Sequence, residues 1–176
     1  MGFEQRAFEK DRHQLNELVD LESGFRIAVD NLGAELVSIA RNPGNTDPIA
    51  YLYRDGEVLP SGKGWQNHAT VMGYFLHRLW GEKTLYEGEE IVGGNHGFLR
   101  REIFADPEIT ISDRATLTYS LPARQIGARE YPRKVSFQIS YALFGNNVEV
   151  SFVFQNEELE PGGRLSRRFS MRFNRA

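Results

Sequence analysis

The sequence predicts an all-β protein, an antiparallel β-sandwich, and three observations support this. Apolar and polar residues alternate with period two through much of the chain, for example over residues 135–143, as they do in strands with one buried face. Short turn segments join these stretches without an intervening amphipathic helix, so neighbouring strands should pair antiparallel. With 40% hydrophobic residues, a chain of 176 residues can bury a core between two packed sheets.

The first strands are predicted in the amino-terminal third of the chain. Residues 25–29 and 35–40 alternate on either side of a turn at 31–33, which indicates a β-hairpin. A further strand is expected at 49–53. The glycine-rich and aromatic section from 60 to 94 is predicted as long loops laid over a sheet.

Alternation resumes in the second half of the chain. The pattern there predicts strands at 109–111, 115–120, 135–143 and 148–154. Gly145 and Asn146 tolerate positive φ angles, so we expect a tight hairpin between the last two strands.

Both ends of the chain depart from this pattern. Residues 1–17 are polar and weakly periodic, and we read them as an arm that is either a frayed helix or disordered. Residues 157–176 are rich in arginine, as a truncated or frame-shifted end or a solvated tail would be. The predicted organisation is an arm at 1–17, a β-sandwich domain at 18–156 and a divergent tail at 157–176.

Composition excludes several classes of function. The 21 basic and 24 acidic residues give a net charge of −3, too balanced to indicate a nucleic-acid or membrane partner. The chain has no cysteine, and its four histidines lack paired spacing, so we expect no metal site. No apolar run approaches the roughly 20 residues of a membrane span. We expect a soluble, cytoplasmic protein with a small-molecule partner.

The most informative segment is His96-Gly97-Phe98-Leu99-Arg100, preceded by Gly93-Gly94-Asn95. It combines a titratable imidazole and a permanent cation with glycines that let a ligand approach the backbone, while Phe98 can anchor the turn. A glycine-rich turn with a structural histidine explains the same residues equally well.

In their order along the chain, these pieces resemble the aldose 1-epimerase (galactose mutarotase-like) family of large β-sandwiches, of the supersandwich type. The resemblance covers roughly residues 18–156. It rests on the hairpin segment 32–39, the arginine-bearing segment 73–80, the loop 96–100 and a strand ending at 154–156. Leu99 stands where the family more often has a small residue, so we expect it to crowd the mouth of the pocket.

The resemblance implies cofactor-free interconversion of the α and β anomers of an aldose by acid/base ring opening. A general base removes the anomeric proton while a general acid protonates the ring oxygen. By resemblance, His96 lines the sugar site as the candidate catalytic residue, and Arg78 contacts sugar hydroxyls. Arg100 matches an arginine that holds phosphate in relatives acting on phosphorylated hexoses, so a sugar phosphate is a second candidate ligand. Asn95 and Trp80 complete the candidate binding residues, although a large aromatic residue is more often part of the core.

One departure from the family bears on activity. Its full-length members are much longer and place their principal histidine acid and glutamate base beyond the strand that ends at Asn156, whereas no histidine follows His96 here. The resemblance therefore implies an incomplete sandwich without the carboxy-terminal half. We expect the available carboxylates to be solvated surface charges (Glu35, Glu82, Glu87, Glu89, Glu90 and Glu102). We expect His77 to be structural and His13 to be solvated.

Three functions stay open at this stage. The chain is an anomer-converting isomerase, or a carbohydrate-binding or sensing module that lost the acid/base pair, or a remnant without a ligand. An incomplete sandwich would also expose an unpaired strand edge, which is usually covered by another chain or element, so a homo-oligomer formed through that edge is expected.

Overall fold

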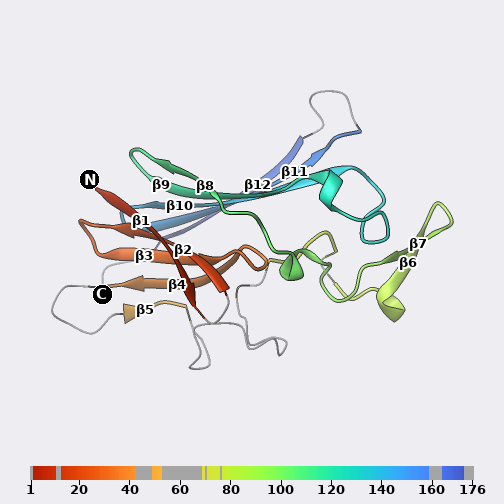
Figure 1. Ribbon diagram of the computed structural model, residues 1–176, viewed down its shortest axis with the longest axis horizontal. Helices are drawn as coiled ribbons and strands as arrows, with labels where there is room; N and C mark the ends of the chain where they lie inside the picture. Colours follow the sequence, from red (N-terminus) through yellow and green to blue (C-terminus); the bar gives the residue numbers. More distant parts are fainter. Residues whose placement is uncertain are drawn as a thin grey trace.

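The structure is a computed structural model that describes residues 2–10, 13–42, 49–52, 69, 71–75 and 77–158, and the backbone of residues 164–172. Two five-stranded sheets form two layers (Figure 1). The first sheet has the order β1 (Phe3–Lys10), β2 (His13–Asp20), β3 (Phe25–Asp30), β4 (Glu35–Arg41) and β5 (Ile49–Ala50). The second has the order β12 (Arg164–Arg172), β11 (Asn147–Asn156), β10 (Val135–Phe144), β9 (Ala115–Leu121) and β8 (Glu108–Ile111).

Every ladder between these strands is antiparallel. The only helices among the described residues are short 3-10 helices: η2 (Trp80–Glu82), η3 (Leu99–Arg101) and η4 (Ala123–Gln125). The predicted all-β antiparallel architecture is therefore confirmed. No helix in the described part of the chain has the length and apolar character needed to cross a bilayer.

The core lies between the two sheets, where β2 packs against β9 and β10. In β9 and β10 every second side chain is buried, as the sequence alternation requires. Leu18, Ile27, Leu117 and Ile139 are fully buried within this layer. The hairpin between β10 and β11 is confirmed as well, because pairing continues to Phe144 and Asn147 around a two-residue loop.

The amino-terminal arm differs from the expectation of a frayed helix or disordered segment. Residues 3–10 form β1, which pairs with β2 in register from Phe3 opposite Asp20 to Lys10 opposite His13. β1 is an edge strand, so its solvated side chains can be polar without losing the backbone ladder. This is why the segment shows little hydrophobic periodicity.

The arginine-rich segment also differs from the expected tail. Residues 164–172 form β12, which pairs with β11 from Arg164 opposite Gln155 to Arg172 opposite Asn147. A backbone ladder makes this segment a strand even though arginines interrupt its alternation. The domain boundaries at 17 and 157 remain a prediction.

Of the predicted loops at 60–94, positions 60–68, 70 and 76 lie outside the described residues, and the described remainder is more regular than expected. β6 (Lys83–Tyr86) and β7 (Glu89–Val92) form a hairpin that projects from the end of the two layers (Figure 1). Its two loop residues, Glu87 and Gly88, both have positive φ angles, at 49° and 87°. This matches the requirement of the tight turn that suits strand twist. Of the predicted strand at 49–53, only Ile49–Ala50 form β5, positions 51 and 52 are not in a strand, and position 53 lies outside the described residues.

Candidate functional site

The glycine loop is tied to the segment at 71–75 by close backbone contact. Gly97 has a φ of 74°, and any Cβ atom there would clash with the carbonyl group of Gly73. That carbonyl accepts hydrogen bonds from the backbone N–H groups of Phe98, at 3.0 Å, and Leu99, at 3.2 Å. The N–H of Gly73 donates to the carbonyl of His96 at 3.2 Å. Glycine is therefore required at position 97 by both backbone conformation and space.

Three of the predicted site residues lie on two adjacent segments. Arg78 and Asn95 form an isolated antiparallel bridge, and the N–H of His96 donates to the carbonyl of His77 at 3.4 Å. Arg78 is exposed, whereas Asn95 and His96 are half-buried. The backbone thus places Arg78, Asn95 and His96 side by side. That their side chains converge on one ligand remains a prediction.

A second contact ties the loop to the β3–β4 turn. Gly33 donates its N–H to the carbonyl of Glu102 at 2.7 Å, and Leu32 forms a bridge with Ile103. The backbone of Arg100 lies against Gly33, where a Cβ atom would come within 3.0 Å of it. Arg100 is half-buried in η3. Three of the four segments that carry the family resemblance, 32–39, 73–80 and 96–100, therefore meet at this loop.

The two apolar residues of the loop belong to the core. Phe98, predicted to anchor the turn, is 3% exposed and stacks on Tyr74 with 5.2 Å between ring centroids. The expectation that Leu99 crowds a pocket mouth is wrong, because its side chain is fully buried. It packs over Gly73, where a Cβ atom would lie 2.5 Å from the Cδ1 of Leu99.

Tyr74 connects the loop to the second sheet, and the sequence reasoning missed it. Its hydroxyl donates to the carbonyl of Val135 at 2.6 Å, and its ring also contacts Phe154 edge-on. Burial is the main cause that raises the pKa of the Tyr74 phenol. Its position next to Gly73 in the resembling segment was the available signal.

Trp80 stands apart from these contacts. Its side chain is 97% exposed in η2, at the base of the β6–β7 hairpin. This excludes the core position that is usual for a large aromatic residue.

The acidic residues divide into exposed and buried groups. Glu82, Glu87, Glu89 and Glu90 are exposed, as predicted. The expectation of a solvated Glu35 is wrong, because this residue is only 5% exposed beside the β3–β4 turn. Glu102 is half-buried. Burial raises the pKa of its carboxyl, Glu130 adds to the rise, and Arg101 opposes it.

The expectation that His13 is solvated is also wrong. Its Nδ1 lies 2.6 Å from an Asp30 carboxylate oxygen, and the Asp30 side chain is 1% exposed. The other Asp30 oxygen accepts the N–H of Leu32 at 2.9 Å. A neighbouring chain of amide and carboxylate hydrogen bonds joins Asn16, Asn31 and Asp106. This buried polar cluster orders the turn against which the candidate site packs.

Two further features bear on ligands. No group of three or more metal-ligating side chains occurs in the described ranges. An open pocket of about 290 Å³ lies on the outer face of the second sheet. It includes none of the predicted site residues, and its lining is Ser120, Leu121, Pro122, Ser136, Phe137, Gln138, Val153, Gln155 and Glu157.

Comparison with known proteins connects this geometry to a fold family. No protein-family model and no curated protein matches the chain, but solved structures do. A protein from Synechocystis sp. PCC 6803 is 17% identical with a TM-score of 0.59, over 86% of this chain and 48% of that one. A galactose mutarotase related enzyme from Lactobacillus acidophilus is 20% identical with a TM-score of 0.58, over 87% and 43%. A galactose mutarotase-like protein from Lactobacillus casei is 16% identical with a TM-score of 0.57, over 88% and 45%.

These matches establish the fold. The chain has the galactose mutarotase-like fold, and it spans about half the length of the structures that it matches.

Proposed function

We propose that this chain is an aldose 1-epimerase-like protein that binds an aldose, or a sugar phosphate, at the surface formed by residues 73–78 and 95–100. One observation carries the proposal. The segments that resemble the family are far apart in the sequence, yet they contact one another through Gly33, Gly73 and Gly97 within a mutarotase-like fold.

The side chains at this surface have the chemistry that a sugar needs. A guanidinium donates to hydroxyl oxygens, an amide both donates and accepts, and an imidazole can hold or transfer a proton. Arg78, Asn95 and His96 supply these three groups from adjacent backbone positions. Arg100, half-buried beside Gly33, is the cation proposed to hold a phosphate group on the ligand.

Anomer exchange needs more than binding. The reaction withdraws a proton from the anomeric hydroxyl and delivers one to the ring oxygen, so two groups must act on different atoms of the ring. His96 is the proposed catalytic residue for one of these transfers, and no histidine follows it in the sequence. We therefore propose that this chain binds aldoses with low affinity and accelerates mutarotation little above the rate in water.

Saturation-transfer NMR with glucose, galactose and a hexose 6-phosphate tests binding. We expect transfer to the sugar protons with the unaltered chain, and loss of the signal in Arg78→Ala and His96→Ala. Lys10→Ala, which removes an exposed cation from β1, is the matched control and should bind as the unaltered chain does. An unchanged signal in both site variants would contradict the proposed surface.

Polarimetry on freshly dissolved α-glucose and α-galactose separates the alternatives. Binding without acceleration supports a carbohydrate-binding module, and neither effect supports a remnant without a ligand. Rapid acceleration that His96→Ala abolishes would show that both proton-transfer groups lie within these 176 residues.

A further inference from the structure

The β6–β7 hairpin has one face toward the protein and one face toward solvent. Its register pairs Lys83 with Val92 and Leu85 with Glu90, so these four side chains share one face. We call this the outer face. Ile91, on the opposite face, is only 3% exposed, whereas Leu85 is 71% exposed and Val92 is 43% exposed. The outer face therefore leaves two adjacent aliphatic side chains in water.

Trp80, in η2 directly before β6, is a third exposed apolar residue on this arm. Leu79 packs inward, because a Cβ atom on Gly93 would lie 2.5 Å from its Cδ1. Leu79 has an extended backbone, so the next side chain should point to the other side. Trp80 is accordingly 97% exposed. This short arm therefore exposes three large apolar side chains, Trp80, Leu85 and Val92, whereas exposed apolar residues on a protein surface are normally scattered singly.

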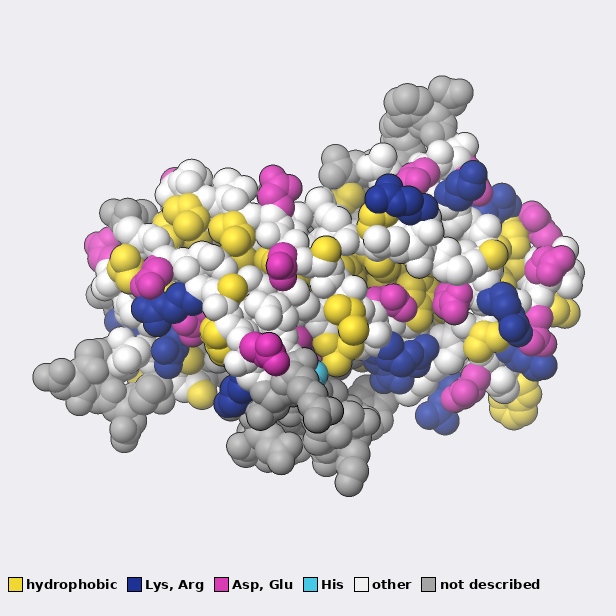
Figure 2. All heavy atoms as spheres, viewed as in Figure 1, with side chains coloured by type: hydrophobic (Ala, Val, Ile, Leu, Met, Phe, Trp, Pro, Cys, Tyr) yellow, Lys and Arg dark blue, Asp and Glu magenta, His cyan; other side chains and the backbone are white. Residues whose placement is uncertain are grey.

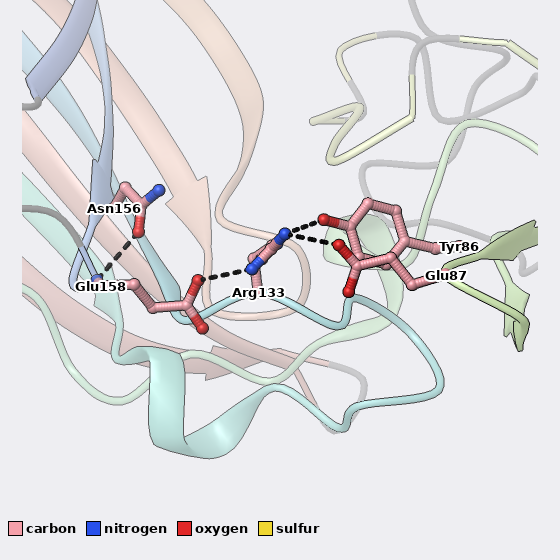
Figure 3. Close-up of polar contacts among 5 residues, drawn as sticks. All are labelled: Tyr86, Glu87, Arg133, Asn156 and Glu158. Atoms are coloured by element: carbon pink, nitrogen blue, oxygen red, sulfur yellow. Dashed lines mark hydrogen bonds and ion pairs between the residues drawn. The ribbon is translucent and has the colours of Figure 1, made fainter.

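Several contacts hold the arm in place. The N–H groups of Gly93 and Gly94 donate to the carbonyl of Glu82, each at 3.1 Å, and the N–H of Val92 donates to the carbonyl of Arg129 at 2.8 Å. At the tip, Arg133 from the segment before β10 contacts the hydroxyl of Tyr86 and the carboxylate of Glu87 (Figure 3).

The same arginine reaches back to the sheet. Its other terminal nitrogen lies 3.5 Å from Glu158, just past the end of β11 (Figure 3). Its guanidinium carbon also lies 4.9 Å from the centre of the Tyr86 ring. The arm is therefore attached at its base and its tip, and its outer face is presented in a fixed orientation.

The charges on the outer face indicate what covers it. Lys83 and Glu90 flank Leu85 and Val92 and form an ion pair of 2.7 Å across the hairpin. Acidic and basic side chains alternate over this end of the molecule (Figure 2). A partner of one charge sign would be attracted by one of these two residues and repelled by the other. Arg129 also lies 4.0 Å from Glu90, and a face that carries charges of both signs beside an apolar centre can meet its own copy with opposite charges opposed.

We propose that the outer face of the β6–β7 hairpin, together with Trp80, is the interface of a homodimer. The two-fold axis runs along the Leu85–Val92 diagonal of the face, so Lys83 lies opposite the partner's Glu90, Leu85 against the partner's Leu85 and Val92 against the partner's Val92. The association is weak, because the apolar centre is small compared with a standard protein interface. This inference is independent of sugar binding, and it uses a different surface from the open sheet edge.

Sedimentation velocity from low micromolar to near-millimolar concentration tests the proposal. The unaltered chain should pass from monomer to dimer, and Leu85→Glu should stay monomeric over the whole range. Ile103→Glu places the same substitution at a side chain that is 80% exposed outside the hairpin, and it should dimerise normally. Circular dichroism of each variant establishes that the fold is retained.

Charge exchange gives a second test, because Lys83→Glu alone should weaken the dimer and Lys83→Glu with Glu90→Lys should restore it. In a Trp65→Phe background, Trp80 is the single tryptophan, so its emission should shift to the blue as the concentration rises. A chain that stays monomeric throughout would overturn the proposal. So would a dimer that survives Leu85→Glu without any shift in Trp80 emission.

Discussion

The backbones of Gly97 and Gly73 lie in direct contact, and this contact joins the loop that carries His96 to the segment that carries Arg78. The carbonyl of Gly73 accepts two N–H groups from the loop and its own N–H returns one hydrogen bond. The backbone position of His96 is thus set by main-chain hydrogen bonds.

Gly97→Ala should destabilise the fold and abolish aldose binding. The new Cβ atom meets both an unfavourable φ of 74° and the carbonyl of Gly73. Gly145→Ala is the matched control, because Gly145 also has a positive φ, of 55°, but nothing lies within 4 Å of its Cβ position. In chemical denaturation we expect the control to lose about 1 kcal/mol and Gly97→Ala to lose clearly more. Equal losses would show that the close approach of Gly97 to the carbonyl of Gly73 adds nothing to the cost of the substitution.

Asp30→Ala should be among the more destabilising single substitutions in the first sheet. The carboxylate is 1% exposed and accepts hydrogen bonds from His13 and the N–H of Leu32. Its removal leaves two partly buried donors without this acceptor, at a cost of about 3 kcal/mol. Asp113→Ala, at an exposed turn, should change the free energy of unfolding by less than about 0.5 kcal/mol. Similar losses in the two variants would contradict a structural role for the buried pair.

The sequence alone predicted the strands that bury one face in the core. β9 and β10 alternate because their inner faces pack against the first sheet, and that pattern is visible without a structure. β1 is an edge strand with solvated side chains, and β12 is defined by its ladder with β11. Backbone pairing rather than apolar periodicity makes these two segments strands, so neither could be predicted from hydrophobic pattern.

The candidate site was likewise predictable from the sequence only in part. Composition and glycine spacing identified the loop around His96, and the family resemblance pointed to Arg78. The buried partners of the loop depend on contacts between segments distant in the sequence, such as Tyr74 with Val135 and Asn31 with Asp106. Local pattern carries no record of these contacts, so Tyr74, His13 and Glu35 were missed or misplaced.

Deprotonation of Glu102 should lower the stability of the folded protein as the pH rises. Its folded-state pKa is raised by burial and by Glu130, so the folded protein binds this proton more tightly than the unfolded chain does. The resulting stabilisation is complete below the ordinary carboxyl pKa of about 4.3 and is lost as the pH rises through the raised value. Glu102→Gln should therefore be more stable than the unaltered chain at neutral pH, by less than about 1 kcal/mol because the site is partly solvated.

Urea denaturation at several pH values measures this difference. The gain from Glu102→Gln should disappear at low pH, where both side chains are neutral. Glu9→Gln, at an exposed position of β1, controls for the amide itself and should show no such trend. A Glu102→Gln variant that is less stable than the unaltered chain at neutral pH would contradict this prediction, because it would show that the charged carboxylate stabilises the fold.

Tyr141→Phe and Tyr119→Phe should change the free energy of unfolding in opposite directions or by clearly unequal amounts, although both rings are buried between the sheets. The Tyr141 hydroxyl donates to the carbonyl of Ala34 at 2.7 Å. The Tyr119 hydroxyl has no hydrogen-bond partner among the described residues, although it lies near Asn16 and Asp30. Tyr141→Phe leaves a buried carbonyl unpaired and should cost about 1 to 3 kcal/mol, whereas Tyr119→Phe should be neutral or stabilising. Chemical denaturation of the two variants measures both values. A loss at Tyr119 as large as the loss at Tyr141 would show that the buried polar cluster around Asp30 holds a partner for the Tyr119 hydroxyl, such as an ordered water molecule.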